Sequence, residues 1–302
     1  MILLTGATGF LGSRVLASLL DNGHEVISIK RSTSNLYRIE DLLKHKKLHT
    51  VDIDVIKGQT IFDEYEVDTI VHTATEYGRN ETPIVKILEA NLILPLRLAE
   101  LGIKNGVKCF INTDSYFNKK NSSYSNLLNY SLSKKSLLIW LNQLAGEIKV
   151  INVILEHMYG SWDEKSKFFE GLIQEVAVNK VQSVALTHGH QMRDFIYIED
   201  VVSAYIKLIE YGRKHEFVFK TFEVGTGESM QIRQLAKMVK KISKSRTVLK
   251  FGAVAYRSDE IMESKADISQ LLELGWIPKT SIGDGIRKIL VEYGVDASDV
   301  KS

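Results

Sequence analysis

Six short apolar segments rich in β-branched residues alternate with segments of helical spacing, and this alternation restricts the fold more than any other feature of the chain. The helical spacing is clearest over residues 84–101 and 127–144. Such alternation predicts a parallel sheet covered by helices on both faces. The six segments are ILLTG, EVISIK, KLHTVDI, DTIVHTA, KCFINT and KVINVIL. Because they are continuously apolar, we expect α/β architecture with a doubly wound parallel sheet of Rossmann type.

The regular alternation ends near residue 155, and the rest of the 302-residue chain mixes single strands, glycine turns and helices. This length suits one large or two moderate domains. We expect a dinucleotide-binding domain over residues 1–155, with a return segment near 191–222. Residues 156–190 and 223–302 are then expected to form a smaller mixed α/β domain that binds the substrate.

Composition narrows the class of protein. Lysine and arginine number 39 against 37 acidic residues, a net charge of +2 that gives no electrostatic case for binding nucleic acid. The one cysteine, Cys109, lies in an apolar segment and is expected to be a small buried residue, with no metal site. No apolar run approaches the ~18 residues that span a bilayer, and the first residues do not resemble a signal peptide. We therefore expect a cytoplasmic protein with no membrane partner.

Three glycines, Gly6, Gly9 and Gly12, stand between the first apolar segment and the first helical one. A glycine turn in this place lets backbone amides approach a diphosphate, and the helix N-terminus adds partial positive charge. The spacing is G-x-x-G-x-x-G rather than G-x-G-x-x-G. We expect dinucleotide binding; the other interpretation is a tight turn with a purely structural role.

The end of the second expected strand should distinguish NAD from NADP. A carboxylate there would bind the ribose 2′-hydroxyl and repel a 2′-phosphate. This chain has Lys30 and Arg31 instead, followed by three hydroxyl residues. Two cations suit a phosphate, so we expect NADP (NADPH). The alternative is that Lys30 and Arg31 are only exposed charges of a loop.

The segment NYSLSKKS provides Tyr130 and Lys134, four residues apart and so on one face of a helix. An unperturbed phenol has a pKa near ~10, and a neighbouring ammonium is expected to lower it. Thr113 ends an earlier strand, where sheets of this type bind ligands. We expect these three residues to be catalytic.

Together these motifs resemble the short-chain dehydrogenase/reductase superfamily, in particular its extended branch, the NAD-dependent epimerases and dehydratases of nucleotide sugars. The likeness covers nearly the whole chain. The segments that carry it are TGATGFLG, VDIDV, IVHTAT, EANLILPLRLAE, RDFIYIEDV, YRSDEIM and LGWIPKTSIGDGI. The cofactor contacts expected from the motifs are Gly6, Gly9, Phe10, Leu11, Gly12, Lys30, Arg31, Asp52, Ile53, Ala74, Thr75, Asn91, Tyr130 and Lys134.

A narrower likeness, in HTATEYG, FINTDSYFNKK, LEHMYG and FGAVAYRSDEIM, is to NADPH-dependent reductases of CDP-linked 4-keto-3,6-dideoxy sugars in O-antigen synthesis. It implies Tyr130 as proton donor, Lys134 as its electrostatic partner and Thr113 as a hydrogen bond to the carbonyl. Arg193 and Arg257 would hold the diphosphate of the sugar nucleotide. The expected substrate contacts are Tyr77, Asp114, His157, Lys167, Arg193 and Arg257.

The chain departs from the wider branch at four positions. Ser115 replaces the glutamate that serves dehydratases as a base, so dehydration is not expected. His157 replaces an asparagine, and it either touches the sugar or packs as a structural residue. Ser161 and Ile154 replace the usual proline and arginine.

These observations predict an NADPH-dependent reductase of the C4 keto group of a nucleotide-linked 4-keto-6-deoxy or 3,6-dideoxy sugar, with a CDP-linked sugar preferred. One alternative is a nucleotide-sugar 4-epimerase with tightly bound NAD. Another is a non-catalytic protein that senses NADP. The resemblance also implies a homodimer formed through two helices of the larger domain.

Overall fold

A computed structural model describes residues 1–55, 58–79, 81–119 and 127–295. The chain divides into two compact units, the first made of Met1–Ile154 and Val202–Phe222, the second of Leu155–Val201 and 223–295. The chain thus returns to the first unit at Val202 rather than near residue 191. The reason is strand pairing, because Met192 and Arg193 pair with strands of the second unit on both sides.

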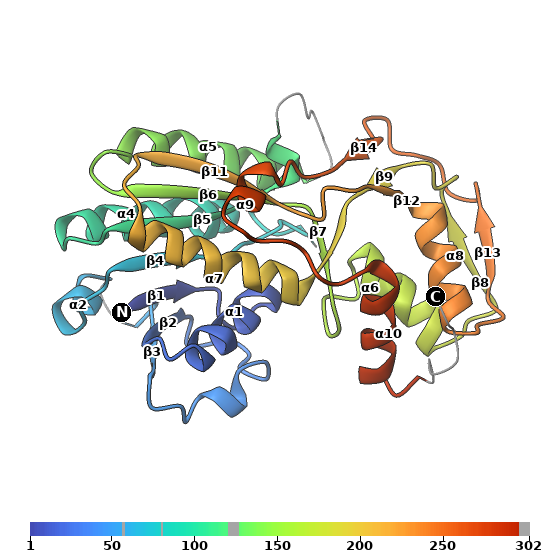
Figure 1. The fold of residues 1–302 in the computed structure, drawn as a ribbon, viewed down its shortest axis with the longest axis horizontal. Helices are drawn as coiled ribbons and strands as arrows, with labels where there is room; N and C mark the ends of the chain where they lie inside the picture. Colours follow the sequence, from blue (N-terminus) through green and yellow to red (C-terminus); the bar gives the residue numbers. More distant parts are fainter. Residues whose placement is uncertain (56–57, 80, 120–126, 296–302) are drawn as a thin grey trace. The chain divides into compact units, whose positions relative to one another are not determined.

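The first unit is built on a seven-stranded sheet with the order β11-β6-β5-β4-β1-β2-β3 (Figure 1). Strand β1 pairs in parallel with both β2 and β4, so the strand order reverses beside it. That reversal is the topological switch point of a Rossmann fold, and the predicted fold class is confirmed. The strands are β1 (Ile2–Thr5), β2 (Val26–Lys30), β3 (Leu48–Asp52), β4 (Thr69–His72), β5 (Cys109–Ser115), β6 (Lys149–Leu155) and β11 (Phe219–Val224).

Helices connect these strands. The segment predicted as one helix over 84–101 contains α3, a π-helical turn η2, and α4, without a break. Pro95 lies just after the π-helical turn, and because proline has no amide hydrogen, one backbone hydrogen bond is absent at this point of the continuous helix. The helices of this unit are α1 (Phe10–Asp21), α2 (Gly58–Glu64), α3 (Ile84–Leu88), η2 (Glu89–Ile93), α4 (Leu94–Lys104), α5 (Leu128–Leu144) and α7 (Ile198–Lys214), with short 3₁₀ turns η1 (Glu40–Leu42) and η3 (Tyr116–Asn118).

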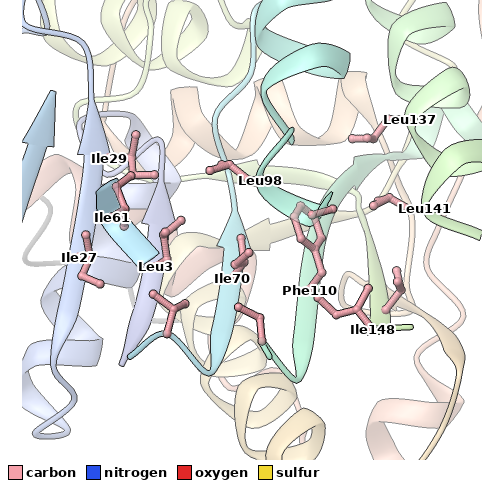
Figure 2. Close-up of a cluster of buried hydrophobic side chains, with 14 of the residues drawn as sticks. Leu3, Ile27, Ile29, Ile61, Ile70, Leu98, Phe110, Leu137, Leu141 and Ile148 are labelled. Atoms are coloured by element: carbon pink, nitrogen blue, oxygen red, sulfur yellow. The ribbon is translucent and has the colours of Figure 1, made fainter. Parts of the chain in front are cut away.

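The two faces of β5 show how the sheet is covered. Phe110 packs with Leu98 of α4 and Leu137 of α5 in the hydrophobic cluster of Figure 2. Cys109 points to the other face, where a Cβ added to Gly212 of α7 would lie 2.8 Å from its Sγ. Cys109 is buried, and burial raises the pKa of its thiol to about 12. The cysteine is therefore the small buried residue that the sequence predicts.

The second unit has short strands in three small sheets, β10-β7, β12-β9-β14 and β13-β8, so its mixed α/β character is confirmed. None of the helices in the described ranges is long and apolar enough to cross a membrane. The strands are β7 (His157–Tyr159), β8 (Ser183–Leu186), β9 (Met192–Arg193), β10 (Phe195–Tyr197), β12 (Met230–Gln231), β13 (Val248–Phe251) and β14 (Glu263–Ser264). The helices are α6 (Phe168–Leu172), η4 (Ile173–Val178), α8 (Ile232–Ile242), α9 (Ser269–Glu273) and α10 (Ile282–Glu292).

Candidate active site

The glycine turn follows β1 at the switch point. Gly6 has a φ of +74°, and a Cβ there would lie 2.5 Å from the amide nitrogen of Ala74. A Cβ on Gly12 would overlap the carbonyl oxygen of Gly6 and lie 2.7 Å from Oγ1 of Thr73. The close packing of the turn against α1 and against the end of β4 therefore requires glycine at both positions.

Gly9 differs, because the protein itself scarcely needs glycine there. Its φ is −83°, and a Cβ would meet only the carbonyl oxygen of Gly6, at 3.2 Å. Gly9 caps the N-terminus of α1, whose first turn has no acidic residue. Bare backbone at the positive end of a helix fits an anionic phosphate group. Phe10 and Leu11 are buried, so only their main chain is placed for such a ligand.

The end of β2 brings predicted cofactor residues into contact with one another. Lys30 Nζ forms an ion pair with Asp52, the last residue of β3. The amide of Ser32 donates to Asp54 Oδ1 at 2.8 Å, and the Ser32 hydroxyl donates to Oδ2 at 2.7 Å. The amide of Ile53 donates to the Lys30 carbonyl at 2.9 Å. Arg31 is exposed, so the two predicted cations differ in their surroundings.

Asn91 ties the loop after β4 to helix α5. Its Oδ1 accepts from the Thr75 hydroxyl at 3.3 Å and from the Glu76 amide at 2.7 Å. Its Nδ2 donates to the Glu76 carbonyl at 2.8 Å and to Ser133 Oγ at 3.0 Å. The side chain is fully buried within the π-helical turn η2, a feature that often accompanies functional sites.

Lys134, a residue of α5, has its ammonium buried in the protein interior. It is 1% exposed, and its Nζ donates to the carbonyl oxygen of Thr113 at 2.8 Å. Burial lowers the pKa of Lys134 to about 8, and the neighbouring Asp114 opposes this change. The ammonium is thus held beside Thr113, near the carboxyl end of β5.

Tyr130 lies one turn earlier on the same helix and is also buried. Its ring stacks on Tyr77 with 5.1 Å between centroids and meets the Phe117 ring edge-on at 6.2 Å. Burial raises the pKa of Tyr130 well above its ordinary value, and a hydrogen bond with Ser115 opposes this only in part. The expected lowering of this pKa is therefore not seen. Tyr130 is held as a neutral phenol, the protonation state of a proton donor.

Thr113 has a partner that the sequence gave no reason to expect. Its Oγ1 lies 2.6 Å from the hydroxyl of Tyr205, a fully buried residue of α7. In the sequence Tyr205 belongs to an amphipathic helix and is indistinguishable from a core residue. The contact joins residues 92 positions apart, and only the fold reveals it.

Asp114 faces the opposite side of β5 from Thr113 and is 2% exposed. Its Oδ1 accepts from the Ser115 amide at 2.8 Å and from Asn118 Nδ2 at 2.7 Å. Its Oδ2 accepts from Asn152 Nδ2 at 3.2 Å. Burial raises the pKa of Asp114, and the Lys134 cation opposes this change. The carboxylate predicted to contact substrate is therefore already surrounded by donors of the chain.

The remaining predicted substrate residues, apart from Tyr77, belong to the second unit. Arg193 is 6% exposed and donates to Glu260 Oε1 at 2.7 Å. Lys167 pairs with Asp163 at 2.9 Å. His157 lies 3.5 Å from the Glu156 carboxylate, and burial lowers the pKa of its imidazole. Arg257 is exposed, and its carbonyl accepts from the Glu260 amide at 3.2 Å.

Comparison with known proteins assigns the class. Residues 2–225 match the model of the NAD dependent epimerase/dehydratase family, and the chain belongs to this family. It is 39% identical over 295 residues to CDP-abequose synthase from Salmonella muenchen, with 96% of each chain covered. It is 32% identical to CDP-abequose synthase from Salmonella typhimurium, with 96% of this chain and 97% of the relative covered. The motifs that resemble reductases of CDP-linked sugars thus agree with these relatives.

Solved structures confirm the fold. The UDP-glucose 4-epimerase of Thermotoga maritima superposes with a TM-score of 0.81 at 24% identity, covering 97% of this chain and 98% of that one. The UDP-glucose 4-epimerase of Stenotrophomonas maltophila, solved with NAD, gives a TM-score of 0.84 at 20% identity, with 97% of each chain covered.

Proposed function

We propose that this protein is an NADPH-dependent reductase of the C4 keto group of a nucleotide-linked 4-keto-6-deoxy or 3,6-dideoxy sugar, CDP-linked, for O-antigen or lipopolysaccharide synthesis. The observation that carries this proposal is the grouping of Thr113, Tyr130 and Lys134 at the end of β5, with Lys134 Nζ 2.8 Å from the Thr113 carbonyl. Identity of 39% to a CDP-abequose synthase over nearly the full chain supports the CDP-sugar.

The glycine turn of Gly6, Gly9 and Gly12 would hold NADPH, which would supply the hydride for C4 when bound. Tyr130 donates its phenolic proton to the C4 oxygen as that oxygen gains charge. The Thr113 hydroxyl hydrogen-bonds the same oxygen and stabilises the developing alkoxide. The Lys134 ammonium, one helical turn away, is proposed to stabilise the phenolate that Tyr130 becomes once its proton has left.

The substrate diphosphate is proposed to bind Arg193 and Arg257. The Arg193 guanidinium already forms an ion pair with the Glu260 carboxylate at 2.7 Å. A diphosphate that binds Arg193 would therefore take the place of this carboxylate. Tyr77, His157 and Lys167 are proposed to face the sugar. Ser115 is a hydroxyl residue and lacks the basicity to remove a carbon-bound proton, which argues against dehydration.

The test is a panel of nucleotide 4-keto sugars assayed by NADPH absorbance, with the configuration at C4 read by NMR. We expect one NADPH oxidised per sugar reduced, fastest with a CDP-linked substrate. No oxidation with any sugar would contradict the reductase.

One observation favours a 4-epimerase with bound NAD as a second candidate. The ion pair between Lys30 and Asp52 reduces the free positive charge at the end of β2, where a 2′-phosphate would lie. An epimerase regenerates its cofactor in each cycle, so it would interconvert C4 epimers without consuming NADPH. The same panel, with UDP-sugar epimers added, separates the two candidates.

We also propose a homodimer. Helix α3 and the turn η2 lie against α5, and together they expose a group of large apolar side chains. Exposed apolar patches of this kind mark contact surfaces. The exposed residues are Ile84, Val85, Ile93, Leu128, Leu132, Ile139 and Trp140.

A further inference from the structure

Tyr205 is a buried phenol that the proposed mechanism leaves without a role. Its side chain is 0% exposed, and its hydroxyl lies 2.6 Å from Thr113 Oγ1. Thr113 is only partly buried, at the carboxyl end of β5. The two hydroxyls thus form a short chain that runs from the interior toward the end of the strand where ligands bind in this fold.

The number of protons and acceptors shows which of the two hydroxyls is the hydrogen-bond donor. Each hydroxyl has one proton, and the pair shares only one bond. Within the described residues the Tyr205 hydroxyl has no second partner. If Thr113 donated to Tyr205, the phenolic proton would be buried with no acceptor, which proteins avoid. Tyr205 is therefore the donor, and the proton of Thr113 is free to point outward.

The packing of α7 holds this phenol in place. Gly212 lies two turns beyond Tyr205 on the same face of α7, and a Cβ there would be 2.8 Å from Cys109 Sγ. Tyr205 and Gly212 thus contact the two ends of β5 through Thr113 and Cys109. The close approach of α7 to β5 and the complete burial of Tyr205 hold the phenol beside Thr113.

We propose that Tyr205 is a positioning residue: by donating to Thr113 it orients the threonine proton toward the C4 oxygen of the substrate. This inference rests on the proposed function, in which Thr113 binds that oxygen. Hydrogen bonds in a chain polarise one another, so the donation from Tyr205 also strengthens the bond that Thr113 makes. Its contribution grows as the carbonyl becomes an alkoxide, and so it acts on kcat rather than on KM.

The test is a double-mutant cycle on Tyr205→Phe and Thr113→Val, measured with NADPH and the best nucleotide 4-keto sugar. We expect Tyr205→Phe to lower kcat about tenfold with KM changed less than about twofold. In the Thr113→Val background the second substitution should change kcat little, because its target is gone. Tyr211→Phe, on the same helix, is the matched control and should keep the wild-type kcat.

The thermal unfolding temperature of each variant shows whether a loss of kcat comes from poor folding. If Tyr205→Phe folds poorly, Tyr205→Met repeats the test, because methionine fills the same space and has no hydrogen-bond donor. A wild-type kcat in Tyr205→Phe overturns the inference. Equal losses in the wild-type and Thr113→Val backgrounds also overturn it, since they indicate a structural role only. If the wild-type protein reduces no sugar, the proposed function itself fails, and the inference falls with it.

Discussion

At the scale of single residues, the buried cation of Lys134 has an energetic cost. Burial lowers its pKa from 10.5 to about 8, so between these two values the unfolded chain binds more protons than the folded one. The free energy of unfolding therefore rises with pH across this window, as far as Lys134 is concerned. Below about pH 8 the folded protein bears the whole cost of the buried charge, which is typical of active sites.

Replacing Lys134 with methionine should therefore stabilise the protein while abolishing turnover. At pH 7 we expect the free energy of unfolding to rise by ~2 kcal/mol, the relief of burial less the lost bond to Thr113. Urea denaturation at several pH values measures this. The gain should shrink toward pH 10, and the exposed neighbour Lys135→Met should show neither effect. Loss of stability at pH 7 would contradict the prediction.

Cofactor choice is also decided by single side chains. Arg31 is exposed at the end of β2, whereas Lys30 pairs with Asp52. Changing Lys30 to Asp and Arg31 to Asn should raise the Kd for NADPH about tenfold or more, and that for NADH much less, because only NADPH carries the 2′-phosphate. Fluorescence titration with both cofactors measures this. An equal response to the two would show that the cations do not bind the phosphate.

At the scale of secondary structure, Asp194 joins three segments of the second unit. Its carboxylate accepts from the amides of Thr226 at 2.8 Å, Gly227 at 3.0 Å and Ala266 at 3.1 Å. The residue is fully buried. This side chain therefore fixes the glycine turn after β11 and the approach to helix α9.

Substituting asparagine for Asp194 turns part of this acceptor into a donor that faces amide protons. We expect a loss of ~2–4 kcal/mol in the free energy of unfolding of the second unit, since buried donors lose a charged acceptor. Chemical denaturation followed by tryptophan fluorescence measures it. The control is Glu273→Gln, which makes the same charge change at an exposed site. Equal stability of the two variants would contradict the prediction.

Five of the six predicted strands appear in the fold because each is an apolar run that the sheet buries on both faces, whereas β3 lies at the edge of the sheet and only its Val51 is buried. The glycine turn and the pairing of Tyr130 with Lys134 on one helix face are local patterns too, and they were predictable for the same reason. The two-residue strands β9, β12 and β14 could not be predicted, because their pairing depends on residues far away in the sequence. The same holds for the bond between Thr113 and Tyr205 and for the ion pair between Arg193 and Glu260.

At the scale of the whole molecule, the exposed apolar group on α3, η2 and α5 bears on assembly. Leu132 and Ile139 are 52% and 71% exposed on α5, seven residues apart and so on one face. Replacing both with glutamate should place charges in a dimer interface and convert dimers to monomers. Light scattering should give twice the 34.2 kDa chain mass for the wild type and one chain mass for the variant.

The matched control places glutamate at Val248, an exposed residue of the second unit, and should leave the dimer intact. A monomeric wild-type protein at micromolar concentration would contradict the proposed homodimer. A variant that stays dimeric would place the interface elsewhere.

Hydride transfer to C4 is followed most directly with NADPH deuterated on the transferred position of its nicotinamide ring. With a CDP-linked 4-keto-6-deoxy or 3,6-dideoxy sugar, we expect one deuterium at C4 of each product molecule and one NADPH oxidised for it, with neither event in Tyr130→Phe. A product without deuterium at C4, or interconverted epimers with the NADPH unconsumed, would contradict reduction by this protein.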